Sequence, residues 1–275
     1  TTIGESAFFD CAGLINVTIP NSVTTIGTSA FHGCKGLTNV TIGNSVKTIG
    51  KWAFYSCYGL SSVSITNSVT EIGECAFVDC TGLINVIIPN SVTEIGKYAF
   101  ADCENLKSIN VAKDNSHYCS ENGVLFDITK KRLIQCPCGI KGNYAIPDGV
   151  TTIGDAAFGF CESLTSVTIP NSVTTIGESA FGVCVSLKSI NVVKDNLHYC
   201  SENGVLFDNT KKTLIQCPCG IKGNYAIPDG VTTIEDGAFL VCAGLTSVTI
   251  PNSVTSIGGG TFAGCTGLTS VTIPN

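Results

Sequence analysis

Two clusters of histidine and cysteine contain the side chains of this chain that are best suited to chemistry. The first cluster consists of His117, Cys119, Cys136 and Cys138, and the second repeats it 81 residues later as His198, Cys200, Cys217 and Cys219. Three thiolates and one imidazole form a recognised zinc ligand set. The spacing is unusual for zinc, because it combines Cys-x-Cys with His-x-Cys instead of two Cys-x₂-Cys knuckles. Three alternatives therefore stay open: a metal site, a disulfide from Cys119 to Cys136 or Cys138, and reduced thiols.

Catalysis is the other chemistry that these clusters suggest, with Cys119 as nucleophile and His117 as base. Such a pair needs a third group that orients the base, and the sequence offers none. The chain has three histidines and contains no phosphate loop, no Gly-x-Ser-x-Gly and no His-Glu-x-x-His sequence. We therefore expect a protein that is not an enzyme and that has no catalytic residues and no cofactor.

A repeat of 23 residues must position these clusters. Nine phenylalanines are 23 residues apart except for two gaps of 58, and each is followed three residues later by a cysteine. The phenylalanines are Phe8, Phe31, Phe54, Phe77, Phe100, Phe158, Phe181, Phe239 and Phe262, and the cysteines are Cys11, Cys34, Cys57, Cys80, Cys103, Cys161, Cys184, Cys242 and Cys265. A short repeat that returns this regularly is typical of a solenoid, in which each repeat packs only against its neighbours.

Each repeat predicts two short strands. In residues 164–169, Val167 and Ile169 alternate with Ser166 and Thr168, which predicts a strand with one buried and one exposed face. Pro170 ends this strand, and residues 173–176 predict a second short β segment on the opposite side.

The rest of each repeat predicts a tight turn. A glycine follows the second β segment in eight repeats, which suggests a corner with positive φ. The Ala-Phe-x-x-Cys stretch is too short for a helix and predicts a 3₁₀-like turn that places the phenylalanine in the core. Stacked repeats would then align the rings about 4.8 Å apart. The repeat cysteines would form a column of buried, reduced thiols, because parallel side chains do not face one another as a disulfide requires.

Two expanded rungs interrupt the period, at residues 116–150 and 197–231. In the first, residues 124–127 and 133–138 flank a polar turn that contains Lys130 and Lys131, so each insertion predicts a β-hairpin with a solvated turn. Both end in Tyr-Ala-Ile-Pro-Asp-Gly-Val, which matches the strand of the ordinary repeat. We therefore expect one solenoid domain over residues 1–275. The chain starts and stops inside a repeat, so we expect it to be part of a longer protein.

Composition excludes two partner classes. The formal net charge is −6 and the chain has a single arginine, Arg132, whereas nucleic-acid binding needs a basic stripe. No apolar run approaches the length of about 18 residues that crosses a bilayer. We expect no nucleic-acid partner and no membrane insertion of this segment.

The repeat resembles the BspA-like leucine-rich repeats, whose unit reads Ile-Gly-x-x-Ala-Phe-x-x-Cys-x-x-Leu-x-x-Val-x-Ile-Pro. The expanded rungs resemble the family's Tyr-x-Ser-x-x-Gly-Val-Leu-Phe element at residues 118–126 and 199–207. The resemblance implies a leucine-rich-repeat superhelix with parallel strands on its concave face. It also implies a cell-surface or secreted adhesion protein of host-associated microbes, which binds extracellular matrix proteins, host or bacterial surface proteins, or glycans.

The binding face predicted for such a module consists of two columns of outward residues on the first strand of each repeat, the front columns. The columns are Asn16, Asn39, Ser62, Asn85, Ser108, Ser166, Ser189, Ser247 and Ser270, and Thr18, Thr41, Ser64, Ile87, Asn110, Thr168, Asn191, Thr249 and Thr272. They contain no tryptophan, tyrosine or arginine, which predicts a weak binder that depends on area. Two other functions for these columns are an ordered-water surface of the ice-binding kind and a purely structural stalk.

Overall fold

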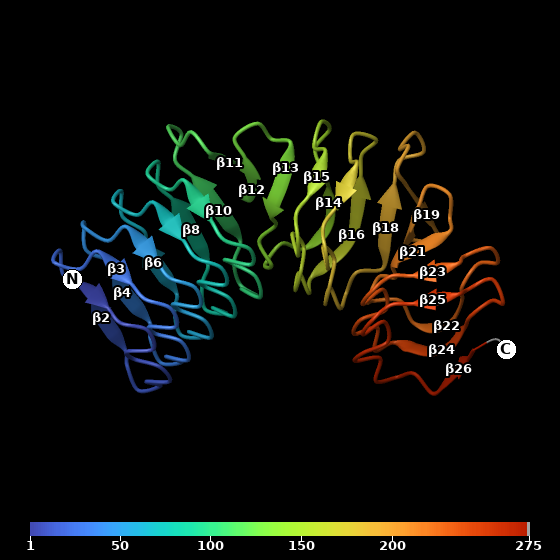
Figure 1. Ribbon diagram of the computed structural model, residues 1–275, viewed down its shortest axis with the longest axis horizontal. Coiled ribbons are helices and arrows are strands. Elements are labelled where there is room, and N and C mark those ends of the chain that lie inside the picture. The colour runs from blue at the N-terminus through green and yellow to red at the C-terminus, as the bar shows by residue number, and fades with distance from the viewer. Residues whose placement is uncertain (274–275) are drawn as a thin grey trace. The chain divides into compact units, whose positions relative to one another are not determined.

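The computed structural model describes residues 1–273, which form β-strands and turns and no helices. The chain divides into two compact units. The first unit contains Thr1–Ile140 and Gly154–Phe158, and the second contains Lys141–Ile153 and the described residues from Gly159 onward. Each unit is a β-solenoid in which successive repeats stack as rungs (Figure 1). This part of the chain has no helix that is long and apolar enough to span a membrane.

Each rung contributes one strand to the front of its unit, where neighbouring strands pair in parallel in two sheets per unit. The front strand of each expanded rung has one register irregularity, at Gly142 and at Gly223, whereas ordinary repeats pair without a register shift. Val40 of β4, for example, lies between Val17 of β2 and Val63 of β6. The front strands of the first unit are β2 (Asn16–Thr18), β4 (Asn39–Thr41), β6 (Ser62–Ser64), β8 (Asn85–Ile88) and β10 (Ser108–Val111). Those of the second unit are β14 (Gly142–Ala145), β16 (Leu164–Ile169), β18 (Ser189–Val192), β22 (Gly223–Ala226), β24 (Leu245–Thr249) and β26 (Ser270–Thr272). The predicted solenoid of parallel strands is confirmed.

The alternation along the front strands also agrees with the prediction. In β16, Val167 and Ile169 are buried, whereas Ser166 and Thr168 are partly exposed. A second ladder of two-residue back strands lies on the other side of the core. Its isoleucines Ile26, Ile49, Ile72, Ile153 and Ile234 are fully buried, whereas Ile95 and Ile176, which precede the expanded rungs, are only partly buried. The back strands are β1 (Thr2–Ile3), β3 (Thr25–Ile26), β5 (Thr48–Ile49), β7 (Glu71–Ile72), β9 (Glu94–Ile95), β15 (Thr152–Ile153), β17 (Thr175–Ile176), β23 (Thr233–Ile234) and β25 (Ser256–Ile257).

The turn segment, which runs from the repeat glycine to the repeat cysteine, differs from the expected 3₁₀-like turn. In residues 27–34 only every second amide bonds three residues back, as Cys34 does to the carbonyl of Phe31 at 3.2 Å. The amides between them bond carbonyls of the next rung, as Phe31 does to Ala53 at 2.8 Å. A 3₁₀-helix would direct every amide back into its own turn. The segment is instead a chain of linked β-turns that also pairs with its neighbour.

Two left-handed residues in every turn segment make this alternation possible. Ser29 and Gly33, which lie two residues before and after Phe31, have φ of 53° and 73°. The same two positions are left-handed in all nine repeats, including Trp52 at 56° and Tyr98 at 60°. Bulky side chains seldom adopt this conformation. The hydrogen bonds to neighbouring rungs hold them in it.

The repeat glycines are not left-handed, so the prediction of a positive-φ corner is wrong. Gly4, Gly27, Gly50, Gly73, Gly96, Gly154, Gly177 and Gly258 are all absent from the positive-φ residues of the described chain. Their role is steric. A Cβ at Gly27 would lie 2.7 Å from the carbonyl oxygen of Ile3 in the preceding rung, and one at Gly96 would lie 2.3 Å from the backbone nitrogen of Glu74. Atoms cannot approach this closely, so the rungs stack only where this corner lacks a side chain.

Glu235, which occupies the glycine position of one repeat, fits the steric explanation. Its counterpart after the first expanded rung is Gly154, where a Cβ would lie 3.0 Å from the nearest atom, the carbonyl oxygen of Leu133. Among the repeat glycines that stack on a preceding rung and whose surroundings are described, Gly154 has the largest distance between an added Cβ and the nearest atom. An expanded rung therefore leaves more room at the next corner, so that an ordinary residue fits after a small shift of its neighbour.

Phenylalanine and cysteine form the two core columns that the repeat predicts. The Phe31 and Phe54 rings stack with centroids 5.3 Å apart and planes 4° from parallel. The thiol of Cys57 donates to the carbonyl of Phe31 at 3.1 Å, and Cys34, Cys80 and Cys103 repeat this contact one rung apart. None of the sixteen cysteines, all of which lie in residues 1–273, forms a disulfide bond in the structure. Seven repeat cysteines are buried, as predicted. The prediction of burial is wrong for Cys11 and Cys265, because each lies in a terminal rung that has only one neighbouring rung.

Each expanded rung forms a three-stranded antiparallel meander. The strands are β11 (Tyr118–Glu121), β12 (Val124–Asp127) and β13 (Arg132–Gln135), and in the second unit β19 (Tyr199–Glu202), β20 (Val205–Asp208) and β21 (Thr213–Gln216). The predicted hairpin is the β12–β13 pair. The additional strand β11 joins β12 through Asn122 and Gly123, which have φ of 52° and 79°. An Asn-Gly pair between two strands is a signal for such a turn that the sequence reasoning missed.

The end of each meander returns to the solenoid path. β21 pairs in parallel with back strand β23, and β22 pairs in parallel with front strand β24. The predicted match between the Tyr-Ala-Ile-Pro sequence and an ordinary front strand is therefore confirmed. Only residues 217–222 connect β21 to β22, whereas residues 177–188 connect β17 to β18. An expanded rung consequently has no full turn segment and no core phenylalanine at that place.

Candidate binding surfaces

The front columns lie on the exposed side of the front strands, as predicted. In the first unit Asn16 is in register with Asn39, and Thr18 with Thr41, so side chains of the same kind stand above one another. Polar neighbours in a column bond to each other: Asn39 Nδ2 donates to Asn16 Oδ1 at 3.2 Å, and Ser108 Oγ donates to Asn85 Oδ1 at 2.8 Å. The columns are thus a partly self-bonded polar surface with a fixed spacing.

An apolar spot interrupts the columns at β8. Ile87 is 63% exposed, and Ile84, just before the strand, is 43% exposed. Ile84 is not a column residue and sequence reasoning did not select it. Exposed isoleucines are common on protein surfaces, so these two residues do not by themselves define a binding site.

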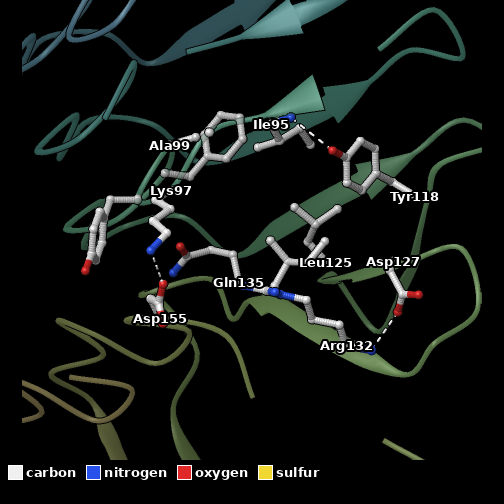
Figure 2. A pocket seen from close by; sticks show the side chains of 13 residues that line it. Ile95, Lys97, Ala99, Tyr118, Leu125, Asp127, Arg132, Gln135 and Asp155 are labelled. Atoms are coloured by element: carbon white, nitrogen blue, oxygen red, sulfur yellow. Dashed lines mark hydrogen bonds and ion pairs between the residues drawn. The ribbon is translucent and has the colours of Figure 1, made fainter. Parts of the chain in front are cut away.

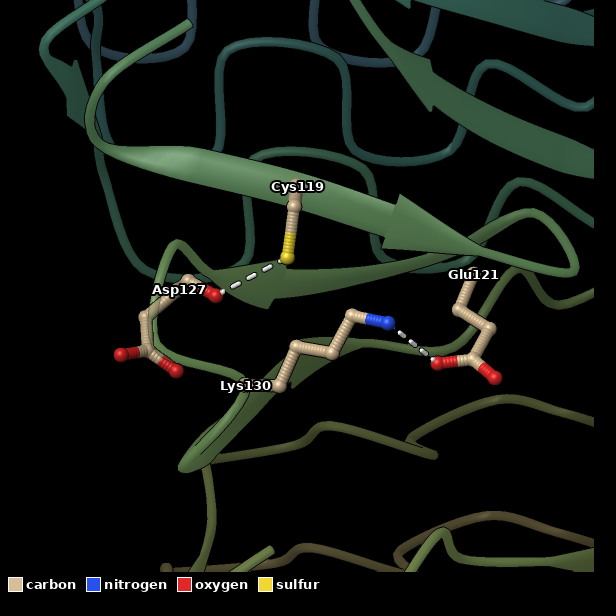
Figure 3. Close-up of polar contacts among 4 residues, drawn as sticks. All are labelled: Cys119, Glu121, Asp127 and Lys130. Carbon is tan, nitrogen blue, oxygen red and sulfur yellow. Dashed lines mark hydrogen bonds and ion pairs between the residues drawn. The ribbon is translucent and has the colours of Figure 1, made fainter. Parts of the chain in front are cut away.

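The structure places the cysteines of the first expanded rung on separate strands. Cys119 lies on β11, opposite Phe126 of β12, and its thiol donates to the backbone carbonyl of Asp127 at 3.1 Å (Figure 3). Cys136 follows β13 and is fully buried. Because β12 lies between β11 and β13, the two cysteines are about two strand spacings, or ~10 Å, apart. A disulfide needs Cα atoms within about 7 Å, so this arrangement does not bring Cys119 within reach of Cys136.

The structure does not bring the ligands of the proposed metal site together either. No three His, Cys, Asp or Glu side chains in residues 1–273 are close enough to hold one metal ion. His117 is exposed and lies beside Ser116, with Nδ1 3.1 Å from its hydroxyl. In the second expanded rung Cys200 likewise bonds the carbonyl of Asp208, while Cys217 and Cys219 are buried.

Cys119 and Cys200 are also poorly suited to nucleophilic chemistry. Partial burial raises the pKa of Cys119, and it raises the pKa of Cys200 in the same way, in spite of a lysine near each thiol. The lysine beside Cys119, Lys130, is paired with Glu121 at 2.8 Å (Figure 3). A reactive cysteine needs the opposite shift, toward the thiolate.

Two residues that the sequence analysis did not select fix the start of the first expanded rung. Asn115 is 3% exposed, and its side chain donates to the carbonyls of Pro89 and Val92 and accepts from the amides of His117 and Tyr118. The hydroxyl of Tyr118 then accepts from the amide of Ile95 at 3.0 Å, where the next back strand would otherwise bond. Asn196 and Tyr199 repeat these contacts in the second unit.

Each expanded rung leaves a pocket where its turn segment is missing. The first pocket, of about 290 Å³, lies between the turn segment of residues 95–100 and Asp155 of the following repeat (Figure 2). Its apolar walls come from Ile95, Phe100 and Leu125. The ammonium of Lys97 reaches the carboxylate of Asp155 at 2.6 Å and so bridges the opening. Arg132 lines the pocket too, and its backbone amide donates to Asp127 at 2.6 Å.

The second pocket has the same position in the second unit and a different charge. It has a volume of about 560 Å³ and lies between the turn segment of residues 176–181 and residues 235 and 236 of the following repeat. The counterparts of Lys97, Arg132 and Gly154 are Glu178, Thr213 and Glu235, whereas Asp127 and Asp155 correspond to Asp208 and Asp236. The first pocket has two cations and two carboxylates, and the second has four carboxylates.

The fold, the parallel ladders and the repeat define this chain as a leucine-rich-repeat solenoid. Comparison with known families finds six copies of the BspA type leucine rich repeat region, over residues 1–122, 136–226 and 212–275. The chain belongs to this family, as its repeat predicted. Proteins of this kind are generally protein-interaction modules without catalytic activity.

Solved structures agree with this assignment. A leucine-rich repeat protein from Eubacterium ventriosum is 25% identical, with a TM-score of 0.69 over all of this chain and 81% of that one. A leucine rich cell surface protein from Faecalibacterium prausnitzii is 31% identical, with a TM-score of 0.67 over 98% of this chain and 76% of that one. The pneumococcal vaccine antigen PcpA has the same fold at 21% identity and a TM-score of 0.61, over 93% of this chain and 67% of that one. No curated protein matches the sequence.

Proposed function

We propose that this chain is a non-catalytic adhesion module that binds extracellular proteins or glycans through its front columns. The observation that supports this is the regular exposure of the columns, in which each rung adds a pair of mostly small polar residues in register. Serine, threonine and asparagine lose little side-chain entropy when a partner covers them. Binding would therefore grow with the number of rungs in contact, without a single dominant anchor.

We also propose that the module is displayed outside the cell and that residues 1–275 act as one solenoid domain. The support for display is similarity, since one related structure belongs to a leucine rich cell surface protein. The natural partners in this setting are extracellular matrix proteins, surface proteins of host or bacterial cells, and their glycans.

The test is a binding assay of the purified chain on immobilised matrix proteins, on a glycan panel and on bacterial cells. The informative variant places lysine at Thr41, Ser64 and Ile87, which are exposed residues of one front column in three successive rungs. Lysine there covers the surface with long, charged side chains and should weaken binding about tenfold or more.

The matched control places lysine at Asn44, Asn67 and Asn90, which are exposed at the corners of the same three rungs. The two triple variants have equal charge, so a general electrostatic effect would weaken both. Binding that survives in the front-column variant, or that disappears equally in both variants, would exclude the front columns as the binding face.

A further inference from the structure

Three thiols of the second unit are in contact with one another in its core. Cys217 and Cys219 belong to the Cys-Pro-Cys sequence that follows β21, and Cys242 is the repeat cysteine of the next rung (Figure 1). The thiol of Cys242 is hydrogen-bonded to the thiols of both Cys217 and Cys219. The three side chains are at most 3% exposed, so the core encloses this thiol cluster.

The missing phenylalanine of the expanded rung explains how the thiols meet. The amide of Cys217 bonds the carbonyl of Ala238 at 2.7 Å, just as the core phenylalanine of an ordinary rung bonds the alanine of the next rung. Cys217 thus stands where an ordinary rung has its phenylalanine, and its smaller side chain leaves room. Cys242 still donates to the carbonyl at this position, but at 3.8 Å instead of the 3.1 Å of Cys57. Its thiol is held less closely by the backbone and contacts the neighbouring thiols.

Cys219 is not stacked directly on Cys242, unlike successive members of the cysteine column. Cys217 is aligned with Phe239, so Cys219, two residues further on, is offset by one residue from Cys242. One strand spacing and one residue along the chain place the two Cα atoms about 6 Å apart, which is within the range of disulfides. The thiol of Cys219 also donates to the carbonyl of Leu240 at 3.2 Å, so its side chain points toward the following rung.

We propose that Cys219 and Cys242 form a disulfide when the protein is in an oxidising environment. Of the two thiols that contact Cys242, Cys219 is the more exposed, at 3% compared with 0% for Cys217. A metal ion is not supported as the purpose of the cluster, because no three His, Cys, Asp or Glu side chains in the described part of the chain are placed to hold one. The disulfide ties the expanded rung to the next rung at the level where the ring stack of ordinary rungs is interrupted.

The oxidant that this bond requires is a small disulfide such as oxidised glutathione. The thiolate of Cys219 attacks one sulfur of the glutathione disulfide, forms a mixed disulfide and releases one glutathione thiolate. The thiolate of Cys242 then attacks the Cys219 sulfur and releases the second glutathione thiolate. The two cysteines lose two electrons and two protons, and the glutathione disulfide takes up both to become two glutathione thiols.

The packed core slows this exchange. The hydrogen bond with Cys242 and burial raise the pKa of Cys219 well above its ordinary value, so little thiolate is present while the rung is packed. The disulfide therefore forms during folding or when the rungs near the end of the unit open, on a timescale of minutes to hours. Disulfides of this kind persist in extracellular proteins, so the proposal is compatible with display outside the cell and independent of the front columns.

The experiment incubates the reduced chain in a glutathione redox buffer, blocks the remaining thiols in denaturant and maps tryptic peptides by mass spectrometry without reduction. Trypsin separates residues 213–222, which contain Cys217 and Cys219, from residues 223–275, which contain Cys242 and Cys265. We expect oxidation to join these two peptides in most molecules.

The same digest contains an internal control from the regular cysteine column. Cys34 lies in tryptic residues 1–35 and Cys57 in residues 52–97. They belong to successive rungs, and each thiol donates to a backbone carbonyl at 3.1 Å. These two peptides should stay separate under the same oxidation.

Serine variants identify the two partners. Cys242→Ser should abolish the link, and Cys219→Ser should reduce its yield at least about tenfold, because Cys217 is the stacked residue and not the diagonal one. Cys217→Ser is the matched control, since it alters the same cluster and should leave the link intact, as should Cys265→Ser. Circular dichroism checks that each variant is folded.

Thermal unfolding provides a readout that does not depend on the variants. Oxidation of the unaltered chain should raise its unfolding midpoint by about 5 °C, because a closed loop restricts the unfolded chain. Cys242→Ser should show no such rise.

Four results would overturn the proposal. They are the absence of a link in the oxidised chain, a disulfide between Cys217 and Cys219 instead, an undiminished link in Cys219→Ser, and a link between Cys34 and Cys57 that forms equally well. None of these results bears on the front columns, whose lysine variants are tested by partner binding.

Discussion

Alanine substitution along the column of repeat glycines should give destabilisation that depends on the rung. Gly96, Gly154 and Gly4 occupy the same position in three repeats and have the same negative-φ type of backbone. A Cβ at Gly96 would lie 2.3 Å from the backbone nitrogen of Glu74, one at Gly154 would lie 3.0 Å from the carbonyl of Leu133, and one at Gly4 would have no atom within 4 Å. The three variants therefore differ mainly in steric overlap.

The overlap sets the expected free energies. At Gly96 the contacts are all with backbone, so two rungs must separate against their hydrogen bonds, and we expect a loss of about 3 kcal/mol, the upper end for overpacking. At Gly154 a shift of a few tenths of an ångström suffices, and the loss should be about 1 kcal/mol. At Gly4 alanine restricts only the unfolded chain and should stabilise the protein by about 0.5 kcal/mol.

Denaturant unfolding followed by far-ultraviolet circular dichroism gives the order of the three midpoints, and the fluorescence of Trp52, the single tryptophan, reports separately on the inner rungs. Midpoints are compared because repeat arrays can depart from two-state unfolding. A left-handed corner would make all three alanines costly by a similar amount. Equal losses at Gly4 and Gly96 would refute the steric account.

Three further predictions concern the core and the expanded rungs. Asn115→Ala leaves two carbonyls and two amides without their buried partner and should cost about 3 kcal/mol in unfolding free energy, whereas exposed Asn143→Ala should change it by less than about 0.5 kcal/mol. Tyr118→Phe removes the acceptor of the Ile95 amide, so hydrogen exchange of that amide should accelerate while most other amides keep their rates. Burial raises the pKa of Cys57 to about 12, so the folded state favours the protonated thiol; its contribution to stability is complete below the unfolded pKa and is lost as pH rises toward 12. The unfolding midpoint should fall over that range, and a midpoint that stays constant from pH 9 to 12 would contradict the burial of these thiols.

The periodic part of the structure could be predicted from the sequence because each rung meets a copy of itself. The Phe31 ring stacks on Phe54, and in the first unit the thiols of Cys34, Cys57, Cys80 and Cys103 each donate to the carbonyl of the phenylalanine one rung before, so one repeat predicts the core contacts of the next. The strand alternation and the exposed columns follow from the same rule. The front columns as a binding face stay a prediction, as does the pairing state of the expanded-rung cysteines in solution.

Predictions failed where a residue's role depends on the distance between rungs. The corner glycines suggested positive φ. A glycine can be required either for positive φ or because a side chain would not fit, and the sequence does not distinguish these two reasons. The left-handed positions are instead occupied by Ser29, Trp52, Tyr98 and others, whose residue types give no sign of it. Asn115 and Tyr118 were missed for a related reason, since the partners that tie them to the preceding rung, Pro89, Val92 and Ile95, lie 20 or more residues back in the chain.

The sequence by itself determined the repeat, the parallel ladders, the core columns and the places where the period breaks, because local patterns and self-stacking suffice for these. Only the tertiary structure decided that β12 separates Cys119 from Cys136, that the corner glycines serve close packing, and that each expanded rung leaves a pocket. These facts depend on which backbone segments meet across rungs and on the space left where one segment is missing. The difference in charged residues between the two expanded rungs can be read from the sequence. Only the fold shows that Glu178 lines the second pocket at the position where Lys97 pairs with Asp155 in the first.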